Sequence, residues 1–272
     1  MALNIALVSG KGGVGKSTVC AALAREFAAL GKRTLAVDCD IRLRSLDLLL
    51  GFSRGLVFTW GDVLRKQCTL KQALLNDGKL SLLAAPLLPL AAHEITLFGV
   101  LLRSLQGYFD VILLDASAGF STGFVLAAEN ADVAIVVAQP EPVCVRAAAA
   151  CVQELGNARQ GGGVVFSSAS VQGSVHGAAY PPGVGQENTA PKPRLLINRF
   201  QRKRTQDGIY FNIDETIDSV GAQLVGVIPE DNEVAGSIAA GYPLPDGCPA
   251  GRAFGRVAQR LLGKNVSLRL DY

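Results

Sequence analysis

Short apolar runs alternate with longer amphipathic stretches along most of this 272-residue chain. Several of the short runs are continuous in Val, Ile and Leu, as is typical of strands covered on both faces of a sheet. They predict strands at residues 3–8, 33–38, 80–85, 111–115, 133–138, 195–198 and 224–228. Apolar residues at helical spacing predict helices at residues 16–30, 94–105, 122–130, 142–155, 215–220 and 252–262. This alternation predicts an α/β fold in which a mostly parallel central sheet carries helices on both faces.

Residues 157–193 interrupt this rhythm. They contain seven glycines and four prolines, few charges and little periodicity. A connection of this length with no pattern of its own is unusual inside a compact domain. We therefore expect one domain over residues 1–272 that carries a Gly/Pro-rich surface insertion at about residues 157–193.

The composition and the N-terminal sequence indicate where in the cell the protein is expected. The formal net charge is only +3, which does not by itself favour binding to nucleic acid or to a membrane. The first residues have no basic segment, and Lys11 follows soon after, so we expect no signal peptide; the longest apolar stretch, residues 80–92, is broken by Pro86 and Pro89. The six cysteines form no C-x-x-C pair, which argues against a zinc or iron–sulfur centre. We expect a cytoplasmic protein.

The pattern G-x-x-x-x-G-K-[ST] lies between the first predicted strand and the first predicted helix. Glycines in such a loop let backbone N–H groups turn towards phosphate oxygens, and the helix N-terminus adds positive potential. In this motif the lysine contacts the β- and γ-phosphates and the next hydroxyl ligates Mg²⁺. These roles fall on Lys16 and Ser17. The loop residues expected to bind nucleotide are Gly10, Lys11, Gly12, Gly13, Val14, Gly15, Lys16, Ser17 and Thr18.

The same glycines also spell G-x-G-x-x-G, the dinucleotide-binding fingerprint. Asp38 ends the next predicted strand, where a ribose-binding acid belongs. Lys16 and Ser17 favour the phosphate loop, because a dinucleotide site needs no lysine after its last glycine. A glycine turn without a ligand is less favoured still, because Lys11 and Lys16 would repel each other without an anion.

A second acidic position follows the predicted strand at residues 111–115. Four apolar residues there end in Asp115, which is the Walker B form. An aspartate at the tip of a strand beside the phosphate loop can hold Mg²⁺ directly or through water. The pattern alone is common, but together with the loop it predicts a Mg²⁺ site.

Four stretches resemble the MinD/ParA family of P-loop ATPases, and most of all its MinD branch. They are residues 10–18, 37–47, 110–119 and 226–231, and residues 207–215 also resemble the MinD pattern. The resemblance covers about residues 2–262 apart from the insertion. It implies a P-loop NTPase fold, ATP and Mg²⁺ as cofactors, a homodimer formed with ATP, and hydrolysis of ATP to ADP and phosphate.

The resemblance also assigns catalytic and metal-site roles. Lys11 matches the signature lysine that reaches the ATP of the partner subunit, and a cation there can neutralise charge that develops on the β–γ bridge. Asp40 matches the acid that orients the attacking water, and Asp38 a neighbouring acid on the Mg²⁺ side. The expected catalytic residues are Lys11, Lys16 and Asp40, and the expected metal-site residues are Ser17, Asp38 and Asp115.

Two further segments match the side of the family's site that holds the base. Asn198 and Arg199 match the adenine-side segment, and Pro229 follows the last strand, where the base packs. An ordinary polar pair at a strand end remains the alternative for Asn198 and Arg199.

The chain departs from the family pattern at three positions. Ser117 stands where the second switch has proline, Ser45 where MinD proteins have asparagine, and Arg42 where the family has glycine. These departures bear on the rate of hydrolysis and on switch coupling rather than on nucleotide binding.

The resemblance implies an ATPase that regulates placement of the cell-division site, with division-regulator proteins as partners. A chromosome- or plasmid-partition ATPase is an alternative, because a basic cluster at residues 199–204 could touch DNA phosphates. The low net charge disfavours that nucleic-acid role. A flagellar-number regulator of the same fold, and a nucleotide-binding module with little turnover, remain open.

The predicted helix at residues 252–262 has an apolar face and a face carrying Arg252, Arg256 and Arg260. A basic amphipathic helix of this kind is typical of a membrane-surface anchor. In the family pattern, however, this stretch matches the last helix of the domain, whose apolar face is core. Residues 266–272 are too short and too weakly basic for a second helix. We therefore expect weak or absent direct membrane binding, with at most peripheral contact at the inner face of the cell membrane.

Overall fold

The computed structural model of the chain describes residues 1–41, 43–52, 55–159, 191–240, 245 and 247–270. Its sheet has eight strands in the order β3-β4-β2-β5-β1-β6-β7-β8. All neighbouring strands are parallel except β3 and β4. The strands are β1 (Leu3–Val8), β2 (Thr34–Asp38), β3 (Leu75–Asp77), β4 (Leu80–Leu83), β5 (Val111–Asp115), β6 (Val133–Ala138), β7 (Lys192–Phe200) and β8 (Gln223–Pro229).

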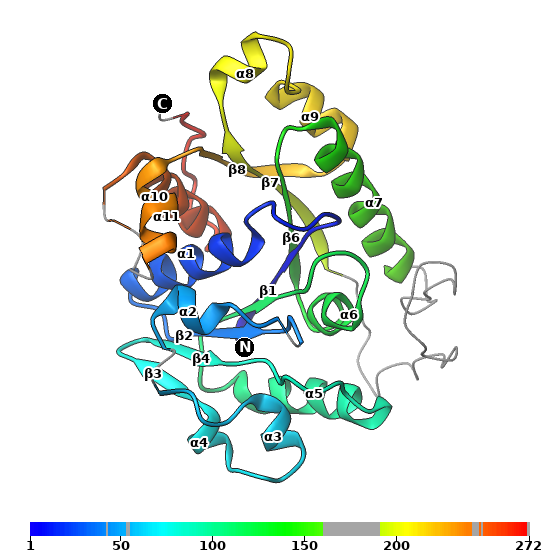
Figure 1. Cartoon of the computed structure of the whole chain (residues 1–272), viewed down its shortest axis with the longest axis vertical. Coiled ribbons are helices and arrows are strands. Elements are labelled where there is room, and N and C mark those ends of the chain that lie inside the picture. Colours follow the sequence, from blue (N-terminus) through cyan, green and yellow to red (C-terminus); the bar gives the residue numbers. More distant parts are fainter. Residues whose placement is uncertain (42, 53–54, 160–190, 241–244, 246, 271–272) are drawn as a thin grey trace.

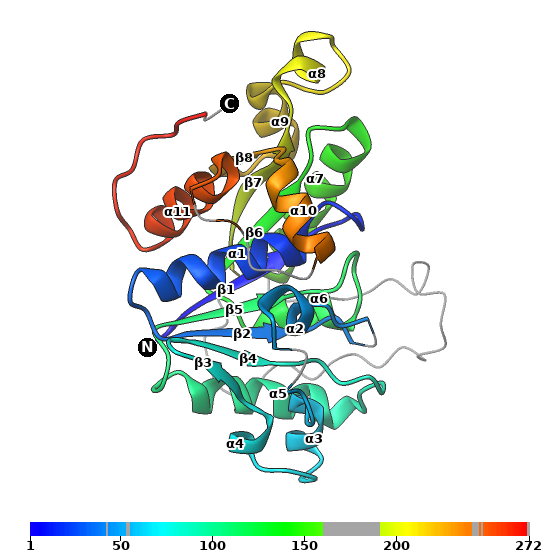
Figure 2. The same ribbon diagram turned by 60° about the vertical axis from the view of Figure 1, so that its left-hand side comes forward.

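Helices cover both faces of this sheet (Figures 1 and 2). The longer ones are α1 (Lys16–Ala29), α5 (Ala92–Leu105), α6 (Thr122–Glu129), α7 (Pro142–Arg159), α9 (Ile213–Val220), α10 (Asn232–Ala240) and α11 (Pro249–Leu261). The shorter ones are α2 (Leu46–Leu50), α3 (Trp60–Leu64), α4 (Leu70–Ala73) and α8 (Arg202–Gln206). The predicted fold class, a mostly parallel sheet between two helical layers, is therefore confirmed.

Successive residues of each central strand enter opposite cores. In β1, Ile5 and Leu7 join the cluster beneath α1 and α11, whereas Ala6 and Val8 join the cluster beneath α5 and α6. Each of these four residues has no exposed surface. A strand that is buried on both faces needs apolar residues at every position, and this is why the continuous runs were informative.

The structure differs from the predicted elements mainly in short elements that were not predicted and in the ends of α7 and β7. β3 and the four short helices α2, α3, α4 and α8 were not predicted, because three to five residues are too few to show a period. α7 continues to Arg159 and β7 begins at Lys192, so these two ends belong to regular elements rather than to the insertion. The remainder of the insertion, residues 160–190, and Arg42 lie outside the described residues.

α11 is part of the domain, as the family pattern implied. Its apolar residues Phe254, Val257 and Ala258 are buried, and the helix packs on β8 and α1. No helix in the described part of the chain is long and apolar enough to span a bilayer.

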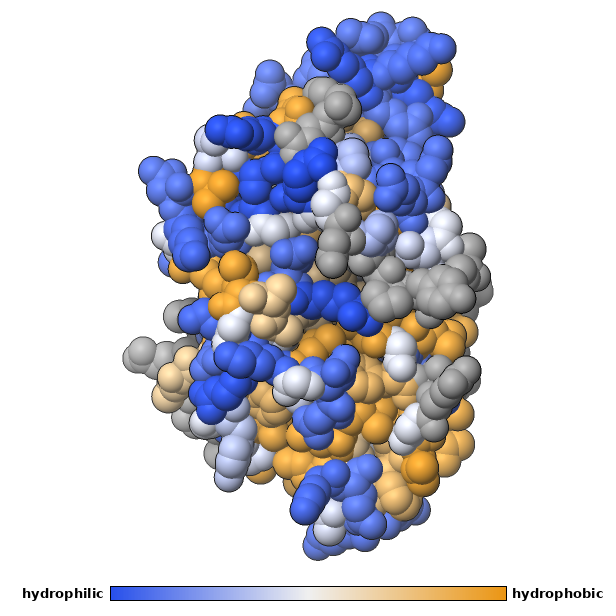
Figure 3. All heavy atoms as spheres, turned by 90° about the vertical axis from the view of Figure 1, so that its left-hand side faces the viewer, coloured by the Kyte–Doolittle hydropathy of each residue, from blue (hydrophilic) through white to orange (hydrophobic). Residues whose placement is uncertain are grey.

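Surface character differs along the length of the molecule. On the face shown in Figure 3, hydrophobic residues gather in the lower half, at the height of β3, β4 and α3 in Figure 1. The upper end, at the height of α8, is largely hydrophilic.

Trp60 ties the segment after α2 to the end of β2. Its side chain is fully buried, its Nε1 donates to the carbonyl oxygen of Asp38 at 2.8 Å, and its ring centroid lies 4.7 Å from that of Phe98. The backbone of Asp38, a predicted site residue, is therefore fixed by a core side chain.

Replacing Trp60 tests this fixation. We expect Trp60→Phe to lower the free energy of unfolding by about 1–3 kcal/mol, because the buried Asp38 carbonyl loses its donor. Trp60→Ala should cost about 3–5 kcal/mol through the cavity it leaves. Denaturant unfolding measures both, with Tyr108→Phe, at a residue 70% exposed, as the control that should change little. Equal stability of the parent and Trp60→Phe would contradict the role of the indole N–H.

Candidate functional site

The phosphate-loop residues connect β1 to α1 across the carboxyl edge of the sheet. Gly13 and Gly15 have φ angles of 81° and 90°, which only glycine adopts without strain. Gly10 lies so close to the backbone carbonyl of Ala147 that a side chain there would collide with it. The motif therefore needs glycine at these positions for its shape.

The first turn of α1 faces the loop with its backbone N–H groups. Gly15 is the N-cap residue and supplies no side-chain cap, and no acidic residue lies in the first turn. These amides, with the positive end of the helix dipole, form the type of anion site that phosphate groups occupy.

Lys16 and Asp115 form a buried ion pair at the centre of the site. Lys16 Nζ lies 2.9 Å from Asp115 Oδ1, and the two side chains are only 6% and 0% exposed. Burial disfavours the charged ammonium, but the charge and hydrogen bond of Asp115, with a contribution from Asp40, together raise the pKa of Lys16. The lysine is therefore held charged at the place where phosphate charge is expected.

The second oxygen of Asp115 is open to a further ligand. Within the described residues, Oδ2 is buried and has no hydrogen-bond partner, which is a costly arrangement for a carboxylate. Asp38 on β2 lies directly opposite Asp115 in the parallel register. Among the described residues there is no cluster of three His, Cys, Asp or Glu side chains that would complete a metal cage.

This donor set fits Mg²⁺. That ion is usually held by one or two carboxylates, with substrate phosphates and water completing the shell. The unsatisfied Asp115 oxygen and the Ser17 hydroxyl at the start of α1 are oxygen donors of the required kind.

Asp38 has a structural role that the sequence pattern did not indicate. Its Oδ1 accepts from the Asp40 N–H at 2.8 Å, and its Oδ2 accepts from the N–H groups of Ser45 and Leu46 at 3.0 and 3.1 Å. Burial and the nearby Asp115 carboxylate raise the pKa of Asp38 to about 7, against these backbone hydrogen bonds. Asp38 therefore holds the segment from Asp40 to α2 beside the phosphate loop.

Asp40 is the half-buried acid of this segment. Burial raises its pKa, while Lys16 acts in the opposite direction. The structure thus brings Asp40, Lys16, Asp38 and Asp115 to one edge of the sheet.

Lys11 lies at the mouth of the loop, with its side chain 44% exposed and its Nζ 3.9 Å from Glu141 Oε2. Glu141 immediately precedes α7 and was not among the predicted site residues. The sequence offered one signal for Glu141: it is an acidic residue that comes soon after β6, the strand that lies next to β1 in the sheet.

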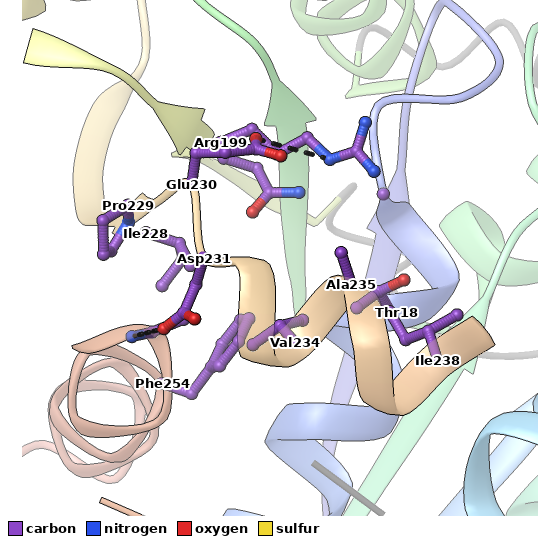
Figure 4. Close-up of a pocket in the computed structure, with 13 residues that line it drawn as sticks. Thr18, Arg199, Ile228, Pro229, Glu230, Asp231, Val234, Ala235, Ile238 and Phe254 are labelled. Atoms are coloured by element: carbon purple, nitrogen blue, oxygen red, sulfur yellow. Dashed lines mark hydrogen bonds and ion pairs between the residues drawn. The ribbon is translucent and has the colours of Figure 1, made fainter. Parts of the chain in front are cut away.

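A pocket beside the loop brings together all three residues predicted for the base. Asn198, Arg199 and Pro229 line it with Gly15 and Thr18 of the phosphate-loop segment. Figure 4 shows α10 and α11 closing the other side, with Val234, Ala235, Ile238 and Phe254 facing the pocket. Sequence reasoning missed α10, although its apolar spacing could have indicated a helix.

Asn198 and Arg199 both make contacts beyond the end of their strand. The buried Asn198 amide donates to the carbonyl oxygen of Val14 at 2.8 Å and so joins β7 to the phosphate loop. Arg199 has a φ angle of 53° at an irregularity in the β7–β8 pairing, and its Nε lies 3.7 Å from Glu230 Oε2. Such strained residues gather at ligand sites.

Two departures from the family pattern have local structural roles. Ser45 is the N-cap residue of α2 and donates its backbone N–H to Asp38. The hydroxyl of Ser117 contacts that of Ser121, the N-cap residue of α6. Both loops that follow acidic strand ends are thus held by local hydrogen bonds.

Comparison with known proteins agrees with this geometry. Residues 5–244 match the family model described as the CobQ/CobB/MinD/ParA nucleotide binding domain. The septum site-determining protein MinD of Helicobacter pylori is 34% identical over 98% of this chain and 92% of that protein. MinD of Escherichia coli K12 is 33% identical over 99% of this chain and 94% of that protein.

A solved structure extends this likeness to three dimensions. The MinC:MinD cell division protein complex of Aquifex aeolicus contains a chain that is 28% identical, with a TM-score of 0.80, over 98% of this chain and 99% of that one. With the family model matching most of its length and the relatives exceeding 30% identity, this chain belongs to the CobQ/CobB/MinD/ParA family of nucleotide-binding domains.

Proposed function

We propose that this chain is an ATPase that dimerises with ATP and regulates placement of the cell-division site. The observation that carries the proposal is the buried Lys16–Asp115 pair beneath an uncapped helix N-terminus, beside a pocket lined by Asn198, Arg199 and Pro229. Curated relatives over nearly the whole chain are septum site-determining proteins, which supports the cellular role.

Nucleotide binding begins with an exchange of partners at Lys16. The β- and γ-phosphates take over the ammonium from Asp115 and accept N–H groups of the loop and of the first turn of α1. Ser17 and Asp115, the latter directly or through water, would hold Mg²⁺ with Asp38 on the same side, and the ion would supply positive charge that neutralises the phosphates. The base occupies the pocket between Asn198, Arg199 and Pro229.

Asp40 orients the attacking water in this proposal. It is half-buried, lies within electrostatic reach of Lys16, and follows the strand whose end holds Asp38. Positioning of the nucleophile is a main contribution that a protein makes to phosphoryl transfer. In this proposal hydrolysis depends on the segment that contains Asp40, which hydrogen bonds of Asp38 and Trp60 hold in place.

Lys11 acts on the nucleotide of a second copy. Its half-exposed ammonium stands at the mouth of the loop rather than beneath it, and a monomeric phosphate loop does not require it. Leu43 and Leu48, in the segment after Asp40, are 79% and 59% exposed. Apolar side chains exposed beside the site are suited to an interface that forms when ATP is bound.

The partner proteins are division regulators in this proposal. The Aquifex aeolicus relative was solved as a complex of MinC with MinD, which supports a partner of that kind. Direct membrane binding remains weak in the proposal, because the apolar face of α11 is buried in the domain.

Lys16→Ala tests the phosphate site. We expect ATP affinity to fall about 100-fold or more, because charged hydrogen bonds to the phosphates are lost. Isothermal calorimetry with Mg²⁺–ATP measures this loss, with the exposed Lys71→Ala as the control. Unchanged affinity would reject the phosphate-loop assignment.

Lys11→Ala separates binding from dimerisation. ATP affinity should stay within about twofold of the parent, since Lys11 lies outside the loop floor, whereas ATP-dependent dimerisation and turnover should be lost. Light scattering with and without ATP measures the dimer. If Lys11→Ala dimerises like the parent, Lys11 does not act on the nucleotide of a second copy.

Asp40→Ala should yield an ATP-bound dimer that hydrolyses about 100-fold more slowly, because the attacking water loses its orienting acid. Phosphate release gives the rate and light scattering the dimer. Asp218→Asn, at an exposed position on α9, controls for loss of one negative charge. Normal phosphate release from Asp40→Ala would show that another group orients the water.

A further inference from the structure

Glu141 is the point where side chains from three parts of the chain converge. Lys11 of the phosphate loop lies 3.9 Å from Oε2, and the Tyr210 hydroxyl donates to Oε1 at 3.2 Å. The Cys144 thiol, one turn into α7, donates to Oε2 at 3.6 Å. The two oxygens of one carboxylate thus connect the phosphate loop with the α8–α9 connection.

Tyr210 is itself held from the other side. Arg204 Nη1 donates to the Tyr210 hydroxyl oxygen at 2.8 Å, and the guanidinium carbon lies 5.2 Å from the centre of the tyrosine ring. The backbone N–H groups of Ile209 and Tyr210 donate to the carbonyl oxygen of Arg204 at 2.9 and 3.1 Å. Tyr210 is therefore anchored on α8 before it reaches Glu141.

The backbone fastens the same two segments together. Phe211 N–H donates to the carbonyl oxygen of Pro140 at 2.9 Å, directly beside the Tyr210–Glu141 hydrogen bond. The chain at residues 210–211 is thus attached to the residues at 140–141 twice, once by side chains and once by backbone. Glu141 is oriented by this attachment and not by the phosphate loop.

The contact between Lys11 and Glu141 is weak by comparison. The side chains are 44% and 35% exposed, and exposed ion pairs of this type contribute little to stability. Such a contact does not hold the fold, but it can break when a stronger anion is offered. If Lys11 acts on the nucleotide of a second copy, its one ammonium must exchange Glu141 for the phosphates of that copy.

We propose that Arg204, Tyr210 and Glu141 form a latch that retains Lys11 in its own subunit and so opposes ATP-dependent dimerisation. The proposal rests on the function proposed above, because it assumes that Lys11 acts on the nucleotide of a second copy. Glu141 is the group that Lys11 must leave, and Tyr210 is a positioning residue that acts through Glu141. The latch places a control on dimerisation at α8, which Figure 1 shows at the end of the molecule that is largely hydrophilic in Figure 3.

Dimer affinity in the presence of a non-hydrolysable ATP analogue tests the latch. We expect Glu141→Gln to tighten the dimer about two- to fivefold, because the competing carboxylate charge is removed. Tyr210→Phe removes only the hydroxyl and should tighten it in the same direction but less. The double variant should match Glu141→Gln alone, since Tyr210 acts through Glu141. Sedimentation equilibrium gives each dissociation constant.

Three controls separate the latch from general effects. Tyr108→Phe and Asp218→Asn remove a hydroxyl and a negative charge at exposed positions and should leave the dimer unchanged. Monomer affinity for the analogue and thermal unfolding of Tyr210→Phe should match the parent, which a merely structural role would not predict. Tyr210→Phe carries the test alone if Glu141→Gln does not fold.

The outcomes distinguish this inference from the function beneath it. The latch is overturned if Glu141→Gln and Tyr210→Phe dimerise as weakly as the parent, or more weakly, while Lys11→Ala still fails to dimerise. Additive effects of the two substitutions would overturn the role of Tyr210 as acting through Glu141. Dimerisation of Lys11→Ala like the parent would instead overturn the proposed function on which the latch rests.

Discussion

The buried ion pair between Lys16 and Asp115 is the interaction on which the site depends. A carboxylate with no exposed surface needs a partner, and the ammonium at the start of α1 supplies it at 2.9 Å. Asp38 lies beside this pair in the sheet register. Its buried carboxyl group accepts hydrogen bonds from three backbone N–H groups. In the proposed function, an incoming phosphate replaces Asp115 as the partner of the buried Lys16 ammonium.

The sheet order makes this arrangement possible. β1 lies between β5 and β6, and β2 lies on the far side of β5. Because these strands are parallel, the phosphate loop, the two aspartates and the segment before Glu141 all leave the same edge. A topological switch point of this kind is where open α/β sheets bind ligands. The pocket that β7, β8 and α10 form beside the loop lies on the same edge.

The sequence predicted what local patterns encode. Short, mostly apolar runs located seven of the eight strands, because strands buried on both faces are rich in apolar residues. β3 was missed, since Leu75–Asp77 has three residues and two of them are exposed. The phosphate loop was predictable because its residues are contiguous. Glu141 and Trp60 were not, because their partners Lys11 and Asp38 are distant in sequence and no spacing relates them.

The last helix shows why charge pattern alone is ambiguous. The arginine face of α11 has the form of a membrane anchor, but Arg260 uses its guanidinium on backbone carbonyls of the same chain. It donates to Val225 on the edge strand β8 and to Val266 and Ser267 of the following segment. At the other end of α11, the Ala250 N–H donates to Asp231, which also accepts from the Glu233 N–H at the start of α10. Both ends of α11 are therefore bound to the rest of the domain, one at the edge strand β8 and the other beside the pocket next to the phosphate loop. A helix held in this way is a structural part of the nucleotide site, and its basic residues follow from that position.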